Sequence, residues 1–327
     1  MDKYSYTAAN TFPIKILKHK KLLKALFGGR IIPIHIQLNP CNRCNLKCQF
    51  CSCSKRDVGL ELSYKAINNI IKKVVDLGCE AVTITGGGEP LMHPKINGII
   101  KDFISQEILV GLVSNGLLLD KLHNKILNKI TWCRISCSDE RPFNKEKVSH
   151  LIKAINHAPK VDWAFSYVVT KDVDISNIIK YIEFANDYKF THIRIVSDLI
   201  NMVDELPSMK YIKKEIQQAG ADDSKVNYQG RKLFDKGQEK CYISLLKPNI
   251  DAKGDIYPCC GSQFSLFQPD LDYSQKMRMG SIKDIEDIYS KQQYFNGSIC
   301  YRCYYKTYND VLGNLLNTNK LQHKEFV

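Results

Sequence analysis

The sequence predicts a mixed α/β fold, a partial (β/α)6 barrel followed by a small cysteine-rich module. From Arg30 to about residue 220, six short apolar runs alternate with segments of helical periodicity. That alternation implies parallel strands joined by right-handed crossovers. After residue 240 the helical periodicity fades and cysteines recur. Six units are too few for a closed eight-fold barrel, so an open six-stranded barrel fits best, with a doubly wound sheet as the alternative.

The strands are expected at residues 31–38, 80–85, 109–114, 131–138, 163–170 and 192–197. The clearest helix begins after Ser63, a natural N-cap, and carries its apolar residues on one face until Gly78 stops it. A second helix is expected after Asp174. In the fourth strand, alternation places Arg134, Ser136 and Ser138 on one face, which should line the barrel interior.

The chain divides by composition into five segments. Residues 1–30 form a basic amphipathic segment, with one helix over 13–27 that covers an open end of the barrel or, less favoured, touches a membrane surface. The barrel occupies residues 31–220, and a polar linker follows at 221–240. Residues 241–310 form the cysteine-rich module, and residues 311–327 form a tail that begins as a helix.

The composition excludes several classes of protein. With 44% hydrophobic and 25% charged residues in 327, the chain is globular rather than disordered. The sequence contains no run of about 18 apolar residues, so no membrane span is predicted. No export signal is recognisable, and a cytoplasmic location is therefore expected. The net charge of +13 makes a nucleic-acid partner possible but does not favour it over a lysine-rich composition. Thirteen clustered cysteines point instead to metal or redox chemistry.

The first cysteine set follows the first strand directly. Cys44, Cys48 and Cys51 form a CxxxCxxC motif. Three thiolates on one short loop suit a [4Fe–4S] cluster and leave one iron without a protein ligand. A zinc site using Cys41 and Cys44 with Cys48 and Cys51 would be strained, because only three residues separate the two pairs.

Further polar and glycine-rich segments follow the strands after this motif. They are Phe50 before the third cysteine, Gly86-Gly87-Gly88-Glu89-Pro90 after the second strand, Ser114-Asn115-Gly116 after the third, Arg134, Ser136 and Ser138 in the fourth, and Arg194 in the sixth. Together with the cysteine motif they resemble the radical S-adenosylmethionine (SAM) superfamily, over roughly residues 31–200. Ser138 departs from the family pattern, which has Asp there, and Asp139 points the other way.

The resemblance implies a chemistry and a set of cofactors. A SAM-binding [4Fe–4S] cluster on Cys44, Cys48 and Cys51, reduced by a flavodoxin or ferredoxin, would cleave SAM to methionine and a 5′-deoxyadenosyl radical that takes a hydrogen atom from substrate. The glycines would let backbone approach the SAM amine, and Glu89 would face that amine or hold the loop. Phe50, Ser114, Asn115, Arg134, Ser136, Ser138 and Arg194 are the further candidates for SAM contacts.

A second cysteine set lies in the C-terminal module. Cys241, Cys259, Cys300 and Cys303 supply four thiols, enough to close another [4Fe–4S] centre. The spacing of Gly254 to Cys259 and the distant CxxC resemble the twitch variant of the SPASM domain, which binds one auxiliary cluster. Zinc is the competing metal, and Cys260 is the competing ligand for Cys259.

Six cysteines are left over, and most should be small buried hydrophobes. Cys53 and Cys260, nearest the two sets, are candidates to return a hydrogen atom to a substrate radical, as an epimerase requires. His93 is expected to be structural.

The substrate expected is a small polar molecule (a sugar, nucleoside or cyclitol) undergoing oxidation or epimerisation. Only about 30 residues precede the first strand, which disfavours a built-in leader-binding domain, so peptide modification stands second. A tail ending Lys-Glu-Phe-Val argues against GTP cyclisation, whose enzymes end in Gly-Gly-Arg. A non-catalytic iron–sulfur or zinc protein that binds nucleic acid is the alternative of another class.

Overall fold

The computed structural model describes residues 8–141, 143–200, 205–230, 236–262, 275–300 and 303–317. A curved ten-stranded sheet in the order β10-β9-β8-β1-β2-β3-β4-β5-β6-β7 forms its centre. The parallel strands of the barrel are β1 (His35–Leu38), β2 (Ala81–Ile84), β3 (Leu109–Ser114), β4 (Trp132–Cys137), β5 (Asp162–Val169), β6 (His192–Ser197) and β7 (Val226–Gln229). All six predicted strands are present. The first begins at His35 rather than at residue 31 because Pro33 has no N–H to donate to the ladder.

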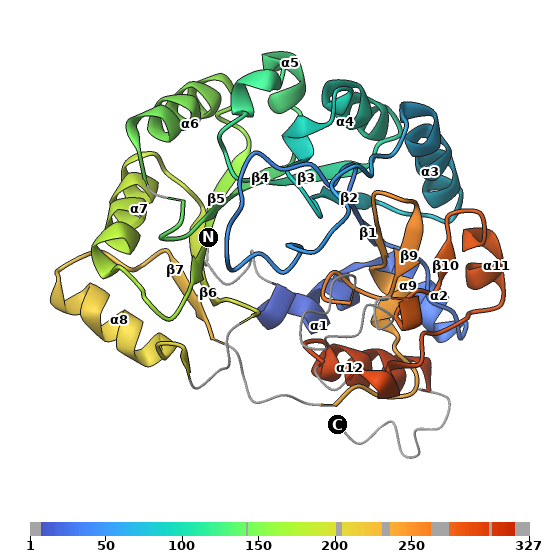
Figure 1. Cartoon of the computed structure of the whole chain (residues 1–327). Coiled ribbons are helices and arrows are strands. Elements are labelled where there is room, and N and C mark those ends of the chain that lie inside the picture. Colours follow the sequence, from blue (N-terminus) through green and yellow to red (C-terminus); the bar gives the residue numbers. More distant parts are fainter. Residues whose placement is uncertain are drawn as a thin grey trace.

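Helices cover the convex face of this sheet as an arc (Figure 1). They are α3 (Tyr64–Asp76), α4 (Ile96–Ser105), α5 (Asn124–Leu127), α6 (Lys145–His157), α7 (Ile175–Asp187) and α8 (Met209–Gln218). Both predicted helix starts are confirmed. Ser63 Oγ accepts the Ala66 N–H at 3.1 Å, and Asp174 Oδ1 accepts the Ser176 N–H at 2.9 Å. Gly78, at φ 93°, follows the end of α3. Short 3-10 turns occupy Pro90–Met92 (η2), Leu119–Lys121 (η3) and Gly297–Ile299 (η5).

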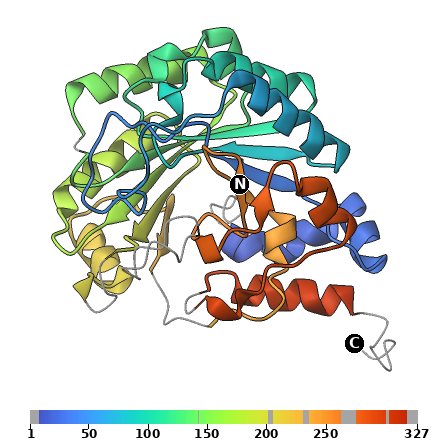
Figure 2. The same ribbon diagram turned by 45° about the vertical axis from the view of Figure 1, so that its right-hand side comes forward.

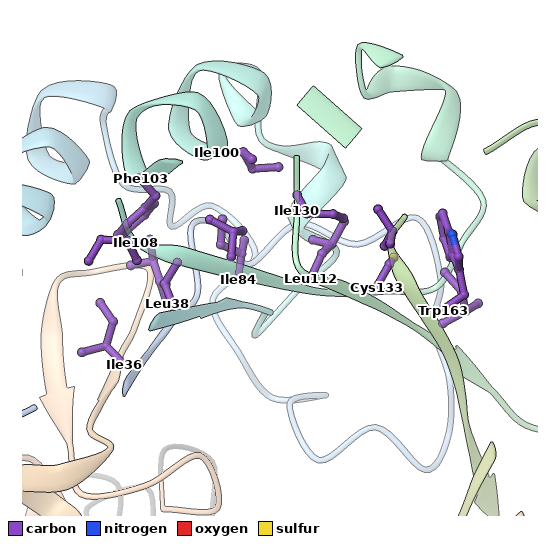
Figure 3. Packing of buried hydrophobic residues seen from close by; sticks show 14 of the residues in the cluster. Ile36, Leu38, Ile84, Ile100, Phe103, Ile108, Leu112, Ile130, Cys133 and Trp163 are labelled. Carbon is purple, nitrogen blue, oxygen red and sulfur yellow. The ribbon is translucent and has the colours of Figure 1, made fainter. Parts of the chain in front are cut away.

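The main apolar core lies between the sheet and these helices. Figure 3 shows Ile84, Leu112 and Cys133 on the strand side with Ile100 and Phe103 opposite them. The same alternation that buries Cys133, Ile135 and Cys137 completely turns their neighbours Arg134 and Ser136 to the other face, the barrel interior. The predicted division of the fourth strand is therefore confirmed.

The C-terminal module extends the barrel sheet rather than standing apart from it. β8 (Asn249–Ile250) pairs parallel with β1, and β9 (Asp255–Tyr257) and β10 (Gly280–Ser281) continue antiparallel. Its helices are α9 (Ile243–Leu246), α11 (Ile285–Ser290) and α12 (Lys306–Leu316). Residues 221–240 are not simply a linker, because β7 lies within them, while residues 231–235 lie outside the described residues. The expected tail beyond residue 317 also lies outside them.

The N-terminal segment forms two helices, α1 (Ala8–Lys18) and α2 (Lys20–Phe27), not the single helix predicted over 13–27. The chain breaks at His19, whose φ of −97° and ψ of 82° are not helical. Both helices lie beside α12 (Figures 1 and 2), and the Phe12 ring stacks on Tyr308 with centroids 4.2 Å apart. Residues 1–7 lie outside the described residues. No helix in the described part of the chain is long and apolar enough to cross a bilayer.

Candidate active site

The first cysteine loop leaves the carboxyl end of β1 and packs on the glycine-rich segment after β2. The Glu89 N–H donates to Arg43 O at 2.7 Å, and the Gly88 N–H donates to Cys41 O at 3.2 Å. A Cβ on Gly88 would lie 2.0 Å from Arg43 O, so only glycine permits this approach. Gly86 is similarly confined by Gly88 O. Gly88 thus lets the cysteine loop and the end of the second strand come together.

Four polar side chains tie three strand ends into what we call the edge network: Asn45, Glu89, Ser114 and Asn115. Glu89 is buried, and its carboxylate accepts the Asn115 N–H at 2.8 Å, the Ser114 hydroxyl at 2.9 Å and the Leu91 N–H at 3.1 Å. Asn115 Nδ2 donates to Asn45 Oδ1 in the cysteine loop at 2.7 Å. Burial raises the pKa of Glu89, and these hydrogen bonds oppose the rise. Of the two predicted roles for Glu89, the contacts support holding the loop.

Two arginines reach the sulfur atoms of this loop. Arg141 Nε donates to Cys48 Sγ at 3.0 Å, and its guanidinium lies over the Phe50 ring at 5.0 Å from the centroid. Arg56 Nη1 lies 3.7 Å from Cys51 Sγ and donates to Cys53 O at 2.6 Å. Positive donors directed at thiol sulfurs favour the thiolate form, which is the form that binds iron.

The thiols of the loop differ in their surroundings. A hydrogen bond from Cys53 lowers the pKa of Cys51 to about 6, whereas burial raises the pKa of Cys44. Cys53 therefore lies against a predicted cluster ligand. The donor set, three thiols on one loop with arginines beside two of them, fits an iron–sulfur cluster.

The polar face of β4 divides along its length. Near its carboxyl end, Ser136 Oγ accepts a hydrogen bond from Arg141 Nη1, so this serine lies close to the cysteine loop. Ser138 is fully buried and its Oγ has no hydrogen-bond partner. Asp139 accepts bonds from Tyr167 and Asn177 on the helix side. As predicted, Asp139 does not replace the missing acid at position 138.

Arg134 and Arg194 lie deeper in the barrel than the other predicted SAM contacts. Arg134 is the third residue of β4 and Arg194 the third of β6, on strands that both flank β5. Arg134 packs over Trp132 at 5.0 Å, and Arg194 Nη2 makes one long hydrogen bond, 3.4 Å, to Ser166 Oγ. A recess of about 60 Å³ beside Arg134 is lined by Trp132, Arg134, Asp162, Ala164, Thr191 and His192. The structure thus separates these arginines from the edge network. A larger groove of about 420 Å³ lies on the outer surface, along α3 and α4, away from both cysteine sets.

The second cysteine set is gathered within the C-terminal module. Burial raises the pKa of Cys300 to about 12 and that of Cys241 to about 11, and the charges of Cys241 and Cys303 add to these shifts. Burial also raises the pKa of Cys259, to which Cys260 and Cys241 contribute. Cys241 thus acts on Cys259 and on Cys300, and Cys303 acts on Cys241 and on Cys300. In the described part of the chain, no three His, Cys, Asp or Glu side chains are arranged to hold a single metal ion.

The leftover cysteines separate clearly. Cys41, Cys79, Cys133 and Cys137 are buried, as expected of structural thiols, whereas Cys260 is exposed. The Cys260 sulfur lies 3.8 Å from Tyr305 OH and within electrostatic range of Arg194 and Lys247. Cys260 is therefore an exposed thiol within electrostatic range of two cationic side chains. The expectation for His93 is confirmed: it is buried, with its ring bonded to Leu62 O at 2.9 Å.

Sequence reasoning missed the two arginines that contact the thiols. Arg56 follows Cys51 by five positions, and Arg141 follows β4 by four. Neither arginine belongs to one of the motifs above. Their positions shortly after the cysteine motif and shortly after the fourth strand were the only indication in the sequence. Lys147 was also missed. It is buried and contacts Tyr181 OH at 3.1 Å and Ser136 O at 3.4 Å.

The fold and the cysteine loop at its carboxyl edge define an iron–sulfur enzyme class, and comparison with known proteins agrees. Residues 38–156 match the family model of the radical SAM superfamily. Over this segment, 119 of the 327 residues, the chain is similar to radical SAM proteins, whose cofactors are SAM and a [4Fe–4S] cluster.

Relatives of known sequence share part of the chain. A protein named GTP 3′,8-cyclase from Aliarcobacter butzleri is 27% identical over 186 residues, 50% of this chain and 54% of its own. A protein of Methanosarcina mazei named "Probable GTP 3′,8-cyclase" is 25% identical over 268 residues, 71% of this chain and 78% of its own. The chain spans about half the length of the first curated relatives that it matches.

Solved structures share the fold. Streptococcus suis SuiB bound to S-adenosylmethionine superposes with a TM-score of 0.58 at 19% identity, over 86% of this chain and 71% of that one. The enzyme anSMEcpe with bound AdoMet and the Kp18Cys peptide superposes with a TM-score of 0.52 at 16% identity, over 77% and 78%. At these identities the likeness establishes the fold alone.

Proposed function

We propose that this chain cleaves SAM reductively and uses the resulting radical to take a hydrogen atom from a substrate held inside the barrel. Cys44, Cys48 and Cys51 would hold the SAM-binding [4Fe–4S] cluster, with Cys53 outside the ligand set. The observation that carries the proposal is the arrangement of the cysteine loop at the carboxyl edge of β1, with Arg141 donating to Cys48 Sγ and Arg56 beside Cys51 Sγ. The bound cluster supplies the electron that cleaves SAM, and a flavodoxin or ferredoxin supplies it in turn.

The chain's own residues position and shield this site. The edge network fixes the cysteine loop against the ends of β2 and β3, so that the thiols and the residues SAM would contact hold their relative positions. Ser136, Ser138, Gly87, Ser114 and Asn115 lie along this edge and are the proposed SAM contacts, with Phe50 packed under Arg141.

In the C-terminal module, we propose that Cys241, Cys259, Cys300 and Cys303 hold an auxiliary [4Fe–4S] cluster of the twitch type. Cys259 is favoured over Cys260 because the charge of Cys241 acts on it, whereas Cys260 is exposed. The proximity of Cys260 to Arg194 and Lys247 makes it the better of the two proposed hydrogen-atom donors. Cys53 is directed at Cys51 instead.

For the substrate we propose a small polar molecule, a sugar, nucleoside or cyclitol, that is oxidised or epimerised. The polar barrel interior supports this class, and the relatives named GTP 3′,8-cyclase support a nucleoside-containing member of it. Radical modification of a peptide is the second candidate. It is favoured by the shared fold of SuiB, one structure of which is bound to the precursor peptide SuiA.

Anaerobic reconstitution tests the proposal. The wild-type chain with dithionite and SAM should form 5′-deoxyadenosine and contain about eight iron atoms, as two [4Fe–4S] clusters require. Cys48→Ala should contain about four iron atoms and form no 5′-deoxyadenosine, while Cys79→Ala, a change at a buried structural thiol, should match wild type in both measurements. Formation of 5′-deoxyadenosine by Cys48→Ala would overturn the assignment of the ligands. If wild-type protein forms none and instead binds nucleic acid tightly, the non-catalytic alternative holds.

A further inference from the structure

The barrel interior contains cationic side chains that no carboxylate neutralises. Arg134, Arg194 and Lys247 come from β4, β6 and the segment before β8. In the described part of the chain, none of the three makes an ion pair with Asp or Glu within 4.0 Å. The Nε atoms of Arg134 and Arg194 are out of solvent and have no hydrogen-bond partner. We call these three residues the interior cations.

The other described arginines show how unusual this is. Arg43 pairs with Glu61, Arg278 pairs with Asp255 at 2.8 Å, and Arg30 donates to Tyr289 O at 3.3 Å. Arg56 and Arg141 reach carbonyl, hydroxyl or sulfur partners in the cysteine loop and on β4. Both guanidinium groups are partly buried, and shielding such a group from water without an anion beside it is unfavourable, so two of them on the interior face require a reason.

The interior cations also lie close enough to repel one another. Burial lowers the pKa of Arg134 to about 9, and the charge of Arg194 adds to the shift. Burial lowers the pKa of Lys247, and Arg134 and Arg194 lower it further. His192, beside them, has its pKa lowered to about 4 by burial and by the same two arginines. The positive potential is therefore shared by one region of the barrel interior.

A small recess lies beside Arg134, and its lining includes one carboxylate, that of Asp162. Ala164, which pairs with both Arg134 and His192 across the sheet, is too small to fill the gap between their side chains. The recess of about 60 Å³ opens at this point.

From these observations we propose that the interior cations bind an anionic group of the substrate, a phosphate or a carboxylate, at the amino-terminal half of the barrel. This inference rests on the proposed function and specifies its substrate class. Guanidinium groups bind both anions in bidentate fashion, which explains the choice of arginine at two of the three positions.

The position distinguishes substrate from SAM. Four residues of β-strand geometry, about 13 Å, separate Arg134 from Ser138 at the carboxyl edge. The carboxylate of SAM would lie at that edge, beside the cysteine loop. An anion at the interior cations would therefore belong to a second molecule whose other end extends toward the cysteine loop.

The second cysteine set is the competing counter-charge. Arg194 and Lys247 lie within electrostatic range of Cys260, and Lys247 also of Cys259. No thiol of the second set is among the groups that shift the pKa of Arg134, which lies beside Trp132 and the recess. Arg134 is therefore the position that best distinguishes a substrate anion from an auxiliary cluster.

Calorimetry on the anaerobically reconstituted full chain tests the proposal, with pyrophosphate and GTP as phosphate probes and succinate and citrate as carboxylate probes. Either the phosphate probes or the carboxylate probes should bind, with a stoichiometry of one molecule per chain. Arg134→Gln and Arg194→Gln should each weaken it about tenfold to a hundredfold, as loss of a charged hydrogen bond predicts. Arg134→Lys should recover part of the affinity, and Arg278→Gln, outside the barrel, should change nothing.

Three outcomes overturn the proposal: binding by neither arm, unchanged affinity in both glutamine variants, or a changed electron paramagnetic resonance spectrum of the auxiliary cluster with unchanged anion affinity. The last would assign the cations to the cluster. Where Arg134→Gln does not fold, Arg134→Lys decides between the same outcomes. Because anion binding is measured without turnover, it can fail while wild-type 5′-deoxyadenosine formation stands, and the reverse also holds.

Discussion

The carboxyl edge and the interior of the barrel differ in how far their buried polar groups are hydrogen-bonded. At the carboxyl edge, both Glu89 oxygens accept hydrogen bonds, and Asn115 is bonded through its side chain and its backbone. In the interior, Arg134 and Arg194 keep atoms without partners. Satisfied polar networks rigidify a structure, whereas unsatisfied ones are unfavourable unless a ligand completes them. The hydrogen bonds of the edge network are therefore completed by the chain itself, although Ser138 Oγ nearby has no partner, whereas the interior arginines have partly unsatisfied guanidinium groups.

The largest effect on iron content and activity is expected at Gly88, where the backbone of the glycine-rich segment packs on the backbone of the cysteine loop. Gly88→Ala would place a Cβ 2.0 Å from Arg43 O and 2.5 Å from Asn42 C, and neither backbone atom can rotate away. The cysteine loop should lose its position, so iron content should fall by about half and 5′-deoxyadenosine formation should fall by more than about tenfold. Gly59→Ala is the matched control in the same loop, because its Cβ would meet only the Asp57 side chain at 3.3 Å. Equal iron content in the two variants would contradict this interpretation of the edge.

The edge network predicts a smaller but still large loss of stability. Glu89→Ala leaves three donors without an acceptor in a buried site, and the free energy of unfolding should fall by about 3 kcal/mol. Anaerobic urea unfolding measures the change. Glu286→Ala, at an exposed residue paired with Lys73, should stay within about 0.5 kcal/mol of wild type. Similar losses in both variants would mean that the network contributes no more than a surface ion pair.

The sequence was sufficient for the barrel because its signals are local. Short apolar runs and the caps at Ser63 and Asp174 depend on neighbouring residues only, and the structure agrees with them. Long-range events were not accessible. β7 is a short strand in a polar stretch and exists because β6 offers a free edge to pair with. The break at His19 depends on α1 and α2 packing beside α12.

The candidate site divides in the same way. Motif spacing located the cysteine loop, the Gly86–Glu89 segment and Ser114-Asn115, since each is a contiguous run. Arg141 and Arg56 were missed because their partners are sulfur atoms reached through space, 93 positions away in the case of Arg141 and Cys48. Strand alternation placed Arg134 inward, but no pattern in one strand reveals whether an acid faces it from another.

Removing an interior cation should act in the direction opposite to Glu89→Ala. Arg134→Met keeps much of the packing on Trp132 and removes a charge that no described carboxylate balances. The free energy of unfolding of the ligand-free protein should rise by about 1–2 kcal/mol, as found when buried charges are replaced by apolar side chains. Urea unfolding measures this, with Arg278→Met as the control at an arginine paired with Asp255. A clear fall in the free energy of unfolding for Arg134→Met would show that the charge of Arg134 is already balanced in the ligand-free protein.

The smallest expected effect is a pH dependence originating at His192. Its pKa is lowered from 6.5 to about 4, by burial first and by Arg134 and Arg194 next. Between those values the unfolded chain binds the proton more readily than the folded chain, so acidification destabilises the fold in this window, and the effect is absent above pH 6.5. His192→Gln should remove about 1 kcal/mol of the stability lost between pH 7 and pH 5, after allowance for partial screening. Urea midpoints at the two pH values measure it, with His157→Gln, an exposed histidine on α6, as the control. In wild-type protein, an anion bound beside the arginines should offset their charge and reduce the loss of stability between pH 7 and pH 5. If neither pyrophosphate nor succinate changes this loss, the anion binds elsewhere.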